Sequence, residues 1–257
     1  MTTLNARDFG TTGKPALVLL HGLLGSSRNW QTVGRDLADT YHVRALDLRN
    51  HGASPHTAEI SYEAMVDDVL FWMDREGIQA AALLGHSMGG KVAMQLACRN
   101  PQRVSRLIVV DIAPKAYLSQ AHRAEFAAMN ELDLTSLQSR AEAELRFESR
   151  VPDWSMRKFL TTNLERTDAG AWRWSVNLPL LTEALPLLEG NSLRADDRYE
   201  GPVHVILGGK SRYVNEADRA KLSEHFPKVR VTVIPEAGHN PHMEARADFV
   251  QAVRSSD

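Results

Sequence analysis

The chain has 257 residues, and its 30 Lys and Arg against 32 Asp and Glu give a formal charge of −2 at pH 7. Hydrophobic residues make up 43% and charged residues 24%, an ordinary globular composition that excludes a disordered chain. The near-neutral balance, without a block of Lys or Arg, argues against nucleic acid or a membrane surface as a partner. Because Cys98 is the single cysteine, no intrachain disulfide can form.

The N-terminus carries no basic segment followed by an apolar run, so a secretory signal is not expected. The longest apolar stretches are far shorter than the ~20 residues that cross a bilayer. We therefore expect a cytoplasmic protein; the sequence leaves its oligomeric state open.

Short apolar runs alternate with longer segments of helical periodicity. The expected strands are Ala16–His21, Val43–Asp47, Ala80–Gly85, Val104–Asp111, Val203–Gly208 and Val229–Pro235. The expected helices are Ser26–Thr40, Ser61–Glu76, Met88–Asn100, Asn215–Phe226 and His239–Val253. This alternation predicts an α/β fold with a mostly parallel, doubly wound sheet covered on both faces. Thr2–Phe9 is expected to add an antiparallel edge strand.

The alternation stops between residues 114 and 199, where helices are expected around 119–130, 137–149, 154–165 and 178–188, with no strand. We therefore predict an α/β core of residues 1–113 and 200–257 and an all-helical cap of residues 114–199. Inserted after the strand that ends at Asp111, the cap would cover the carboxyl edge of the sheet, where ligands of such sheets bind. A helical subdomain that only enlarges the core is the alternative.

Gly85-His86-Ser87-Met88-Gly89 places a Gly-x-Ser-x-Gly pattern between an expected strand and an expected helix. In that setting a serine occupies a sharp turn that exposes its hydroxyl, and the helix N-terminus favours negative charge nearby. The pattern predicts Ser87 as a nucleophile. A glycine-rich turn with a passive serine is the alternative.

A serine hydroxyl needs a base, normally a histidine. His239 follows the last expected strand and opens the last expected helix, so we predict that it is this base. His86 and His242 are expected to have structural or packing roles. The loop His21-Gly22-Leu23-Leu24-Gly25 follows the first long strand, and it nominates the backbone N–H groups of Leu23 and Met88 as an oxyanion hole.

Four segments together resemble the α/β-hydrolase superfamily: HGLLGS, DLRNHGASPH, GHSMGG and the late Gly-His pair. With VVDIAP added, the chain resembles the small YbfF-type bacterial esterases and acyl-thioesterases. This resemblance implies hydrolysis of carboxylic esters or acyl thioesters through a serine triad and a covalent acyl-enzyme, with no cofactor.

The acid of the triad is the contested position. In most of the superfamily an Asp follows the penultimate strand, and here Ser211 stands at that place. Asp111, at the end of the strand that follows the nucleophile helix, is predicted to supply the charge instead, as the branch with VVDIAP implies. An N-cap or loop-anchoring role is the alternative for Asp111, and Asp218 is the reserve candidate.

No metal-binding pattern is present, since His-Glu-x-x-His and Cys-x-x-Cys are both absent. Asp47 is expected to organise its loop by pairing with nearby backbone or with Arg49, and Cys98 to be a small buried hydrophobe. The substrate is expected to be a small acyl ester or thioester. Six basic residues could bind the phosphates of a coenzyme A leaving group if they gather near the mouth of the site: Lys115, Arg123, Arg157, Lys158, Lys210 and Arg212. Solvation at the surface is the alternative explanation for them.

Two other classes of function remain open. A C–C bond hydrolase or lyase would use the same Ser-His pair on an enol-acid substrate, and four arginines of the cap would suit its charge: Arg123, Arg150, Arg157 and Arg173. A ligand-binding protein without catalysis is the third class.

Overall fold

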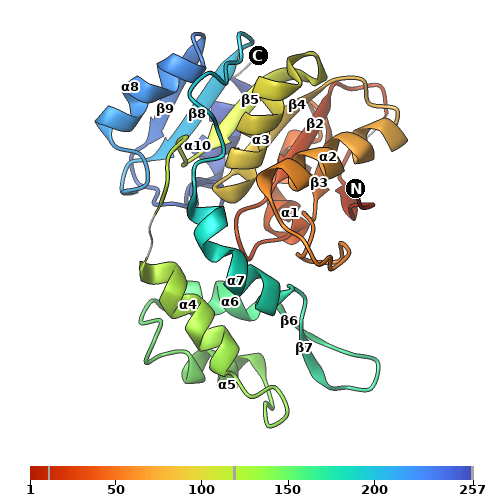
Figure 1. Cartoon of the computed structure of the whole chain (residues 1–257), viewed down its shortest axis with the longest axis vertical. Coiled ribbons are helices and arrows are strands. Elements are labelled where there is room, and N and C mark those ends of the chain that lie inside the picture. The colour runs from red at the N-terminus through yellow and green to blue at the C-terminus, as the bar shows by residue number, and fades with distance from the viewer. Residues whose placement is uncertain (11, 118–119, 256–257) are drawn as a thin grey trace.

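The computed structural model describes residues 1–10, 12–117 and 120–255, and it contains a seven-stranded sheet in the order β1-β3-β2-β4-β5-β8-β9 (Figure 1). The strands are β1 (Ala6–Asp8), β2 (Ala16–Leu20), β3 (His42–Leu46), β4 (Ala81–His86), β5 (Val104–Val110), β8 (Val203–Gly208) and β9 (Val229–Ile234). All neighbours pair in parallel except β1, which pairs antiparallel with β3. The expected parallel sheet and its antiparallel edge strand are confirmed.

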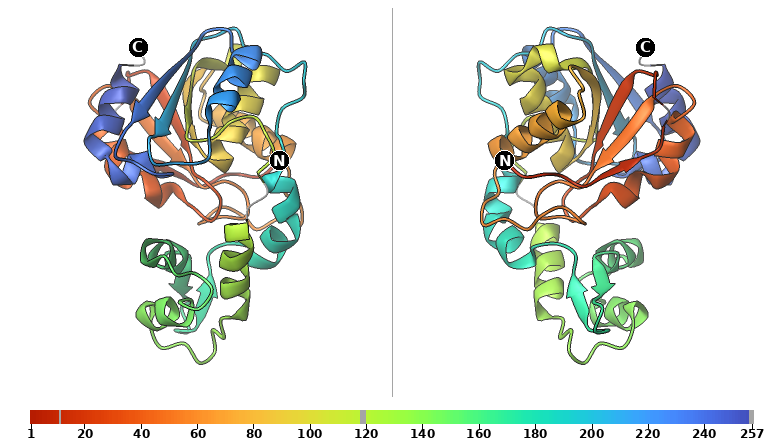
Figure 2. Two further views of the ribbon diagram at one scale, coloured as in Figure 1. Left: turned by 90° about the vertical axis from the view of Figure 1, so that its left-hand side faces the viewer. Right: turned by 90° about the vertical axis from the view of Figure 1, so that its right-hand side faces the viewer.

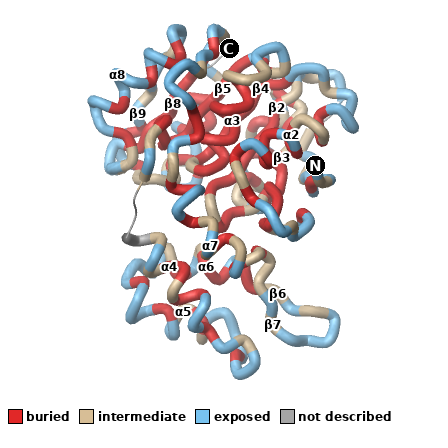
Figure 3. The backbone as a smooth tube through the Cα atoms, viewed as in Figure 1, coloured by how far each residue is buried: buried red, intermediate tan, exposed pale blue. Residues whose placement is uncertain are grey.

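Helices cover both faces of this sheet because its strands are apolar on both sides. One face holds α2 (Tyr62–Arg75), α3 (Met88–Arg99) and α8 (Glu216–His225), and the other holds α1 (Gln31–Leu37) and α10 (Arg246–Arg254) (Figures 1 and 2). Successive side chains of β2 alternate between the two cores: Val18 packs with the α3 side and Leu19 with the α1 side. Figure 3 shows buried residues concentrated along the central strands and α3.

The order of the strands reverses between β2 and β4. From β2 the chain goes outward to β3 on one side, and from β4 it goes outward to β5, β8 and β9 on the other. Ligands of parallel sheets bind beyond the carboxyl ends of the strands at such a reversal. A ligand site is therefore expected at the loops that follow β2 and β4.

Between β5 and β8 the chain forms a separate lobe beside the sheet (Figures 1 and 2). Its elements are α4 (Gln120–Glu131), α5 (Arg140–Arg146), α6 (Trp154–Thr161), β6 (Leu164–Arg166), β7 (Trp172–Trp174) and α7 (Leu178–Glu189). The expectation that this segment is all helical is wrong, because β6 and β7 pair as an antiparallel hairpin. Gly170 closes the hairpin turn with a φ of +79°, a conformation that favours glycine, and the flanking tryptophans suit a strand.

Two predicted helices are shorter or divided. The segment expected to form one helix from Ser26 begins as a 3-10 turn (Ser27–Trp30) before α1. The last expected helix is split into α9 (Pro241–Glu244) and α10, because Ala245 between them has φ −138° and ψ 57°, outside the helical region. The turn η2 (Pro101–Arg103) precedes β5.

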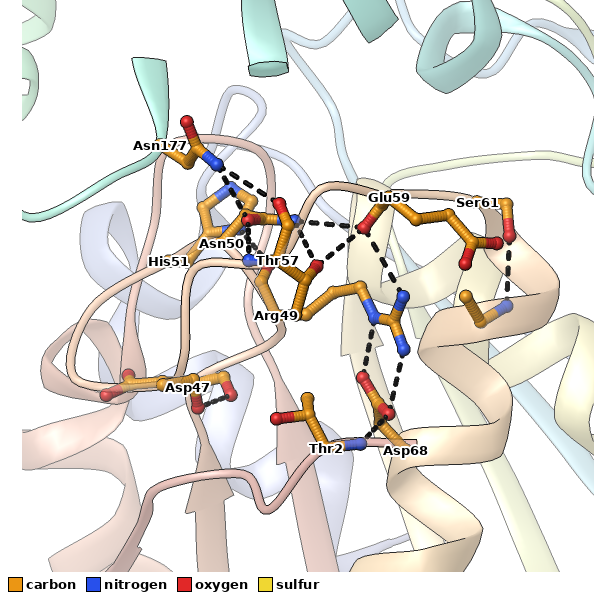
Figure 4. A network of polar contacts seen from close by, with 12 residues as sticks. Thr2, Asp47, Arg49, Asn50, His51, Thr57, Glu59, Ser61, Asp68 and Asn177 are labelled. Atoms are coloured by element: carbon orange, nitrogen blue, oxygen red, sulfur yellow. Dashed lines mark hydrogen bonds and ion pairs between the residues drawn. The ribbon is translucent and has the colours of Figure 1, made fainter. Parts of the chain in front are cut away.

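A polar network beneath the lobe joins it to the core (Figure 4). The backbone N–H of Asn177, at the start of α7, donates to the carbonyl of Asn50 at 2.9 Å, and its side chain donates to the Asn50 side chain at 3.1 Å. Arg49 pairs with the buried Asp68 of α2 at 2.6 Å, and Asp68 also accepts from the backbone N–H of Thr2 at 2.6 Å. This network fixes the loop after β3, on which the first turn of α7 rests.

The far end of α7 is held by Lys91 of α3. Its ammonium group donates to the carbonyls of Glu189 at 3.2 Å and Gly190 at 2.5 Å, where a helix leaves carbonyl groups unpaired. Burial lowers the pKa of Lys91 to about 8. Among the described residues, no helix combines the length and the apolar character needed to span a bilayer.

Candidate active site

Ser87 occupies a sharp turn between β4 and α3, with φ +51° and ψ −118°. This backbone conformation is uncommon for any residue other than glycine. The turn also requires glycine on both sides: a Cβ on Gly85 would overlap the backbone of Gly89, and a Cβ on Gly89 would lie 2.5 Å from the carbonyl oxygens of Leu20 and His21. The Gly-x-Ser-x-Gly pattern thus allows α3 to pass directly against β2.

His239 lies in the loop after β9, and its ring is held on several sides. Its Nδ1 is 2.7 Å from Oδ2 of Asp111. Tyr213 stacks on the ring with centroids 3.6 Å apart and planes 11° from parallel. The backbone carbonyl of His239 accepts a hydrogen bond from Nε2 of His86 at 2.8 Å. The position and the orientation of the imidazole are therefore both fixed by direct contacts.

Asp111 follows β5, with a φ of +51°, and its side chain is 1% exposed. Its Oδ1 accepts from the backbone N–H of Gly208 at 3.0 Å, and its Oδ2 accepts from the Ser211 hydroxyl as well as from His239. A carboxylate only accepts hydrogen bonds, so the His239 Nδ1 donates and the neutral ring keeps a free lone pair on Nε2. Buried charge is stabilised here by several donors at once.

The reserve acid, Asp218, lies elsewhere. Its carboxylate pairs with Lys115 at 2.5 Å and accepts from the backbone N–H of Asn215 at 3.0 Å, in a capping box at the start of α8. These contacts explain its burial without any contact to His239. Of the two carboxylates that the sequence left open, the structure brings Asp111 to the imidazole.

The loop after β2 lies directly against the serine turn. A Cβ on Gly22 would lie 3.2 Å from Cβ of Ser87, so only glycine allows this approach without a shift. His21 fixes the loop: its Nδ1 bonds the carbonyl of Gly22 at 2.8 Å, and its Nε2 accepts from the backbone N–H of Leu48 at 3.0 Å. One donating and one accepting nitrogen require a neutral ring, in keeping with the lowered pKa that burial gives His21. His21 therefore shapes the loop through local hydrogen bonds.

The backbone donors nominated for the oxyanion hole, Leu23 and Met88, each directly follow one of the two residues that meet here, Gly22 and Ser87. Leu23 follows Gly22 in the loop and lines the pocket described below. Met88 is the first residue of α3, where backbone N–H groups have no partner within the helix.

A pocket of about 860 Å³ lies between these loops and the lobe. Ser87, His239 and Leu23 line it from the core, and Glu125, Met156 and Phe159 line it from the lobe. The pocket is thus a mixed cavity, to which both the core and the lobe contribute polar and apolar side chains.

The other histidines near the site are buried and have packing roles, as expected. Burial lowers the pKa of His242 to about 3 and that of His86 well below its usual range. The ring of His242 packs against Trp30 with centroids 4.6 Å apart. Both imidazoles are therefore neutral parts of the wall behind His239.

Two secondary expectations have mixed outcomes. Asp47 does organise its loop, since it accepts from the backbone N–H groups of Ser27 at 2.5 Å and Ala53 at 2.9 Å. The alternative pairing of Asp47 with Arg49 is wrong, because Arg49 binds Asp68.

Cys98 is partly buried, and burial raises the pKa of its thiol to about 12, which keeps the thiol protonated. In the part of the chain that the structure describes, no group of three or more potential metal-ligating side chains is gathered.

Sequence reasoning missed three residues of the site. Tyr213 stacks on His239, Ser211 donates to Asp111, and Glu125 enters the pocket from α4. The position of Ser211 after the penultimate strand was a usable signal for its contact with the acid. No local pattern marks Tyr213 or Glu125.

Comparison with known proteins agrees with this geometry. Residues 15–246 match the family described as the alpha/beta hydrolase fold. The sn-1-specific diacylglycerol lipase ABHD11 of Mus musculus is 36% identical over 253 residues, which cover 96% of this chain and 82% of that protein. Esterase YbfF of Escherichia coli strain K12 is 34% identical over 238 residues, covering 93% of this chain and 91% of that protein.

Among solved structures, one described as a marine microorganism esterase is 31% identical, with a TM-score of 0.96 and complete coverage of both chains. An enol-lactonase from Burkholderia xenovorans, 21% identical with a TM-score of 0.76, shares the fold. The matched family spans most of the chain, and the strand order, the serine turn and the relatives all agree. This chain belongs to the α/β-hydrolase fold family.

Proposed function

We propose that this protein is a serine hydrolase of carboxylic esters that works through a covalent acyl-enzyme. Ser87 is the nucleophile, His239 the general base and Asp111 the carboxylate that orients His239. The observation that carries the proposal is the 2.7 Å contact between Nδ1 of His239 and Asp111, with the ring and Ser87 lining one pocket. Relatives named as an esterase and a diacylglycerol lipase support the reaction class.

The reaction follows from these roles. His239 Nε2 takes the proton of the Ser87 hydroxyl as its oxygen attacks the ester carbonyl, and the oxyanion is held by the backbone N–H groups of Leu23 and Met88. The imidazolium, stabilised by Asp111, then returns the proton to the departing alcohol, which leaves the acyl group on Ser87. Water attacks this ester in the same manner, His239 again moving the proton, and the acid is released. No cofactor enters the scheme.

The pairing of the lobe arginines favours a simple ester over an enol-acid substrate. All four lobe arginines that would suit an acidic substrate form ion pairs with glutamates: Arg123 with Glu189, Arg150 with Glu131, Arg157 with Glu148 and Arg173 with Glu165. Lys115 and Lys210 are likewise paired, with Asp218 and Glu236. A cation already in an ion pair offers less to a second anion, since both charges compete for it.

Replacement of Ser87 by alanine tests the nucleophile. Ser87→Ala is expected to lower kcat for p-nitrophenyl butyrate by at least about 10³-fold, because the site then has no activated hydroxyl to attack the ester. The circular dichroism spectrum should be unchanged. A fluorophosphonate probe should label the native protein and not the variant. Retained turnover in a folded variant would place the nucleophile elsewhere.

The acid is tested by Asp111→Asn against Asp218→Asn as a matched control. Loss of the carboxylate beside His239 is expected to reduce kcat by about 10²- to 10⁴-fold, while the capping-box variant keeps most of it. A larger loss in Asp218→Asn, or in Ser211→Ala, would refute the assignment. A chain-length series of p-nitrophenyl esters and acyl coenzyme A thioesters would then define the preferred acyl group and leaving group.

A further inference from the structure

Glu125 is a carboxyl group that the proposed reaction does not use. It lies on α4 in the lobe, its residue is 8% exposed, and it lines the pocket that Ser87 and His239 also line. Tyr213, the ring stacked on His239, lines the same pocket. The carboxyl is therefore within the space that a bound substrate must occupy.

Glu125 is also without a partner. Over the described residues, it has neither a hydrogen bond nor an ion pair, although other buried acids do: Asp68 binds Arg49, and Glu189 binds Arg123. A carboxyl group that opens into the pocket without a protein partner is held in a largely desolvated place, which costs free energy. A ligand that supplied the missing hydrogen bond would recover this cost on binding.

Burial alone raises the pKa of the Glu125 carboxyl to about 7, so this carboxyl holds its proton more readily than an exposed one. A protonated carboxyl both donates and accepts, and a hydroxyl group does the same. A hydroxyl can also donate to the ionised form. An ammonium group, by contrast, pairs well only with the carboxylate.

We propose that Glu125 hydrogen-bonds a hydroxyl group of the substrate, so that the preferred esters of this enzyme carry a free hydroxyl on their acyl or alcohol part. The inference rests on the proposed esterase reaction and adds to it a substrate class and a specificity residue. An ester that is apolar throughout would bury the carboxyl unpaired, and sites built to bind a hydroxyl discriminate strongly against analogues that lack it.

Two matched pairs of esters test the proposal. Methyl β-hydroxybutyrate against methyl butyrate places the hydroxyl on the acyl part, and glycerol monobutyrate against propyl butyrate places it on the alcohol part. The measurement is kcat/KM by titration of released acid for the native enzyme, Glu125→Leu and Glu125→Gln. Glu183→Leu, an exposed glutamate on α7, is the matched control.

We expect the native enzyme and Glu183→Leu to favour the hydroxylated member of one pair by about 10- to 100-fold. Glu125→Leu should bring that ratio close to one and raise the rate on the apolar member, whereas Glu125→Gln, which still donates and accepts, should keep a preference. The pair that shows the effect identifies the part of the substrate that carries the hydroxyl.

The proposal is overturned if the native enzyme shows no preference in either pair, or if Glu125→Leu retains the preference. A native preference for aminoethyl butyrate over all hydroxylated esters would also overturn it, in favour of a cationic substrate. Because the native enzyme should hydrolyse both members of each pair, such results leave the esterase reaction intact. Failure to hydrolyse any ester would instead reject the proposed function.

Discussion

Replacing Glu125 by glutamine should change how the stability of the protein depends on pH. In the folded protein burial raises the pKa of this carboxyl from 4.5 to about 7, and no partner offsets that cost. Between these two values the unfolded chain has lost the proton that the folded protein still holds. Stability therefore falls as pH rises through this window, and the full penalty is present above about pH 7. Glutamine does not titrate and escapes it.

The magnitude follows from the same two pKa values. A difference from 4.5 to about 7 corresponds to about 3 kcal/mol when fully developed, since each pH unit is worth about 1.4 kcal/mol. Between about pH 5 and about pH 8 most of this is expressed. We expect the stability of Glu125→Gln relative to the native protein to rise by about 2 to 3 kcal/mol over that interval. The burial of the glutamine amide adds a constant that cancels in this comparison.

Urea unfolding followed by tryptophan fluorescence at the two pH values measures this change, with Glu183→Gln as the exposed control. The buried imidazoles titrate in the native protein and in both variants, so they cancel when each variant is compared with the native protein at the same pH. A difference between Glu125→Gln and the native protein that stays constant with pH would refute the reasoning. It would mean that Glu125 is paired or hydrated in solution.

Two further predictions concern groups away from the reacting atoms. Arg49→Met leaves Asp68 buried without its ion pair, so the free energy of unfolding should drop by about 3 to 5 kcal/mol in urea titrations. A double variant with Asp68→Met should recover much of this loss. A single variant within about 1 kcal/mol of the native protein would contradict the role of the pair. The buried His242 has a folded pKa of about 3 against 6.5 when unfolded, so its contribution to stability is complete above about pH 6.5 and is lost as pH falls towards 3. His242→Gln should therefore flatten the acid side of the stability profile by about 1.4 kcal/mol per pH unit, and an unchanged acid slope in calorimetry would argue against a neutral, buried His242.

The order of the core strands and helices was predictable from the sequence because it depends on local patterns. Apolar runs of strand length alternate with helical periodicity, and this pattern requires no knowledge of distant contacts. The serine turn belongs to the same class. Gly85 and Gly89 mark it in the sequence because their hydrogen atoms leave room for the backbone of α3 against β2. Ser87 and His239 could therefore be nominated from their positions at the ends of predicted elements.

Tertiary structure was needed wherever two distant segments meet. Sequence left Asp111 and Asp218 open, and the fold separates them: one lies at a strand end beside His239, and the other caps α8 beside Lys115. The stacking of Tyr213 and the entry of Glu125 into the pocket depend on how the loop after β8 and the lobe sit over the sheet. The hairpin of β6 and β7 was missed because strands so short are stabilised by their pairing, which no local pattern encodes.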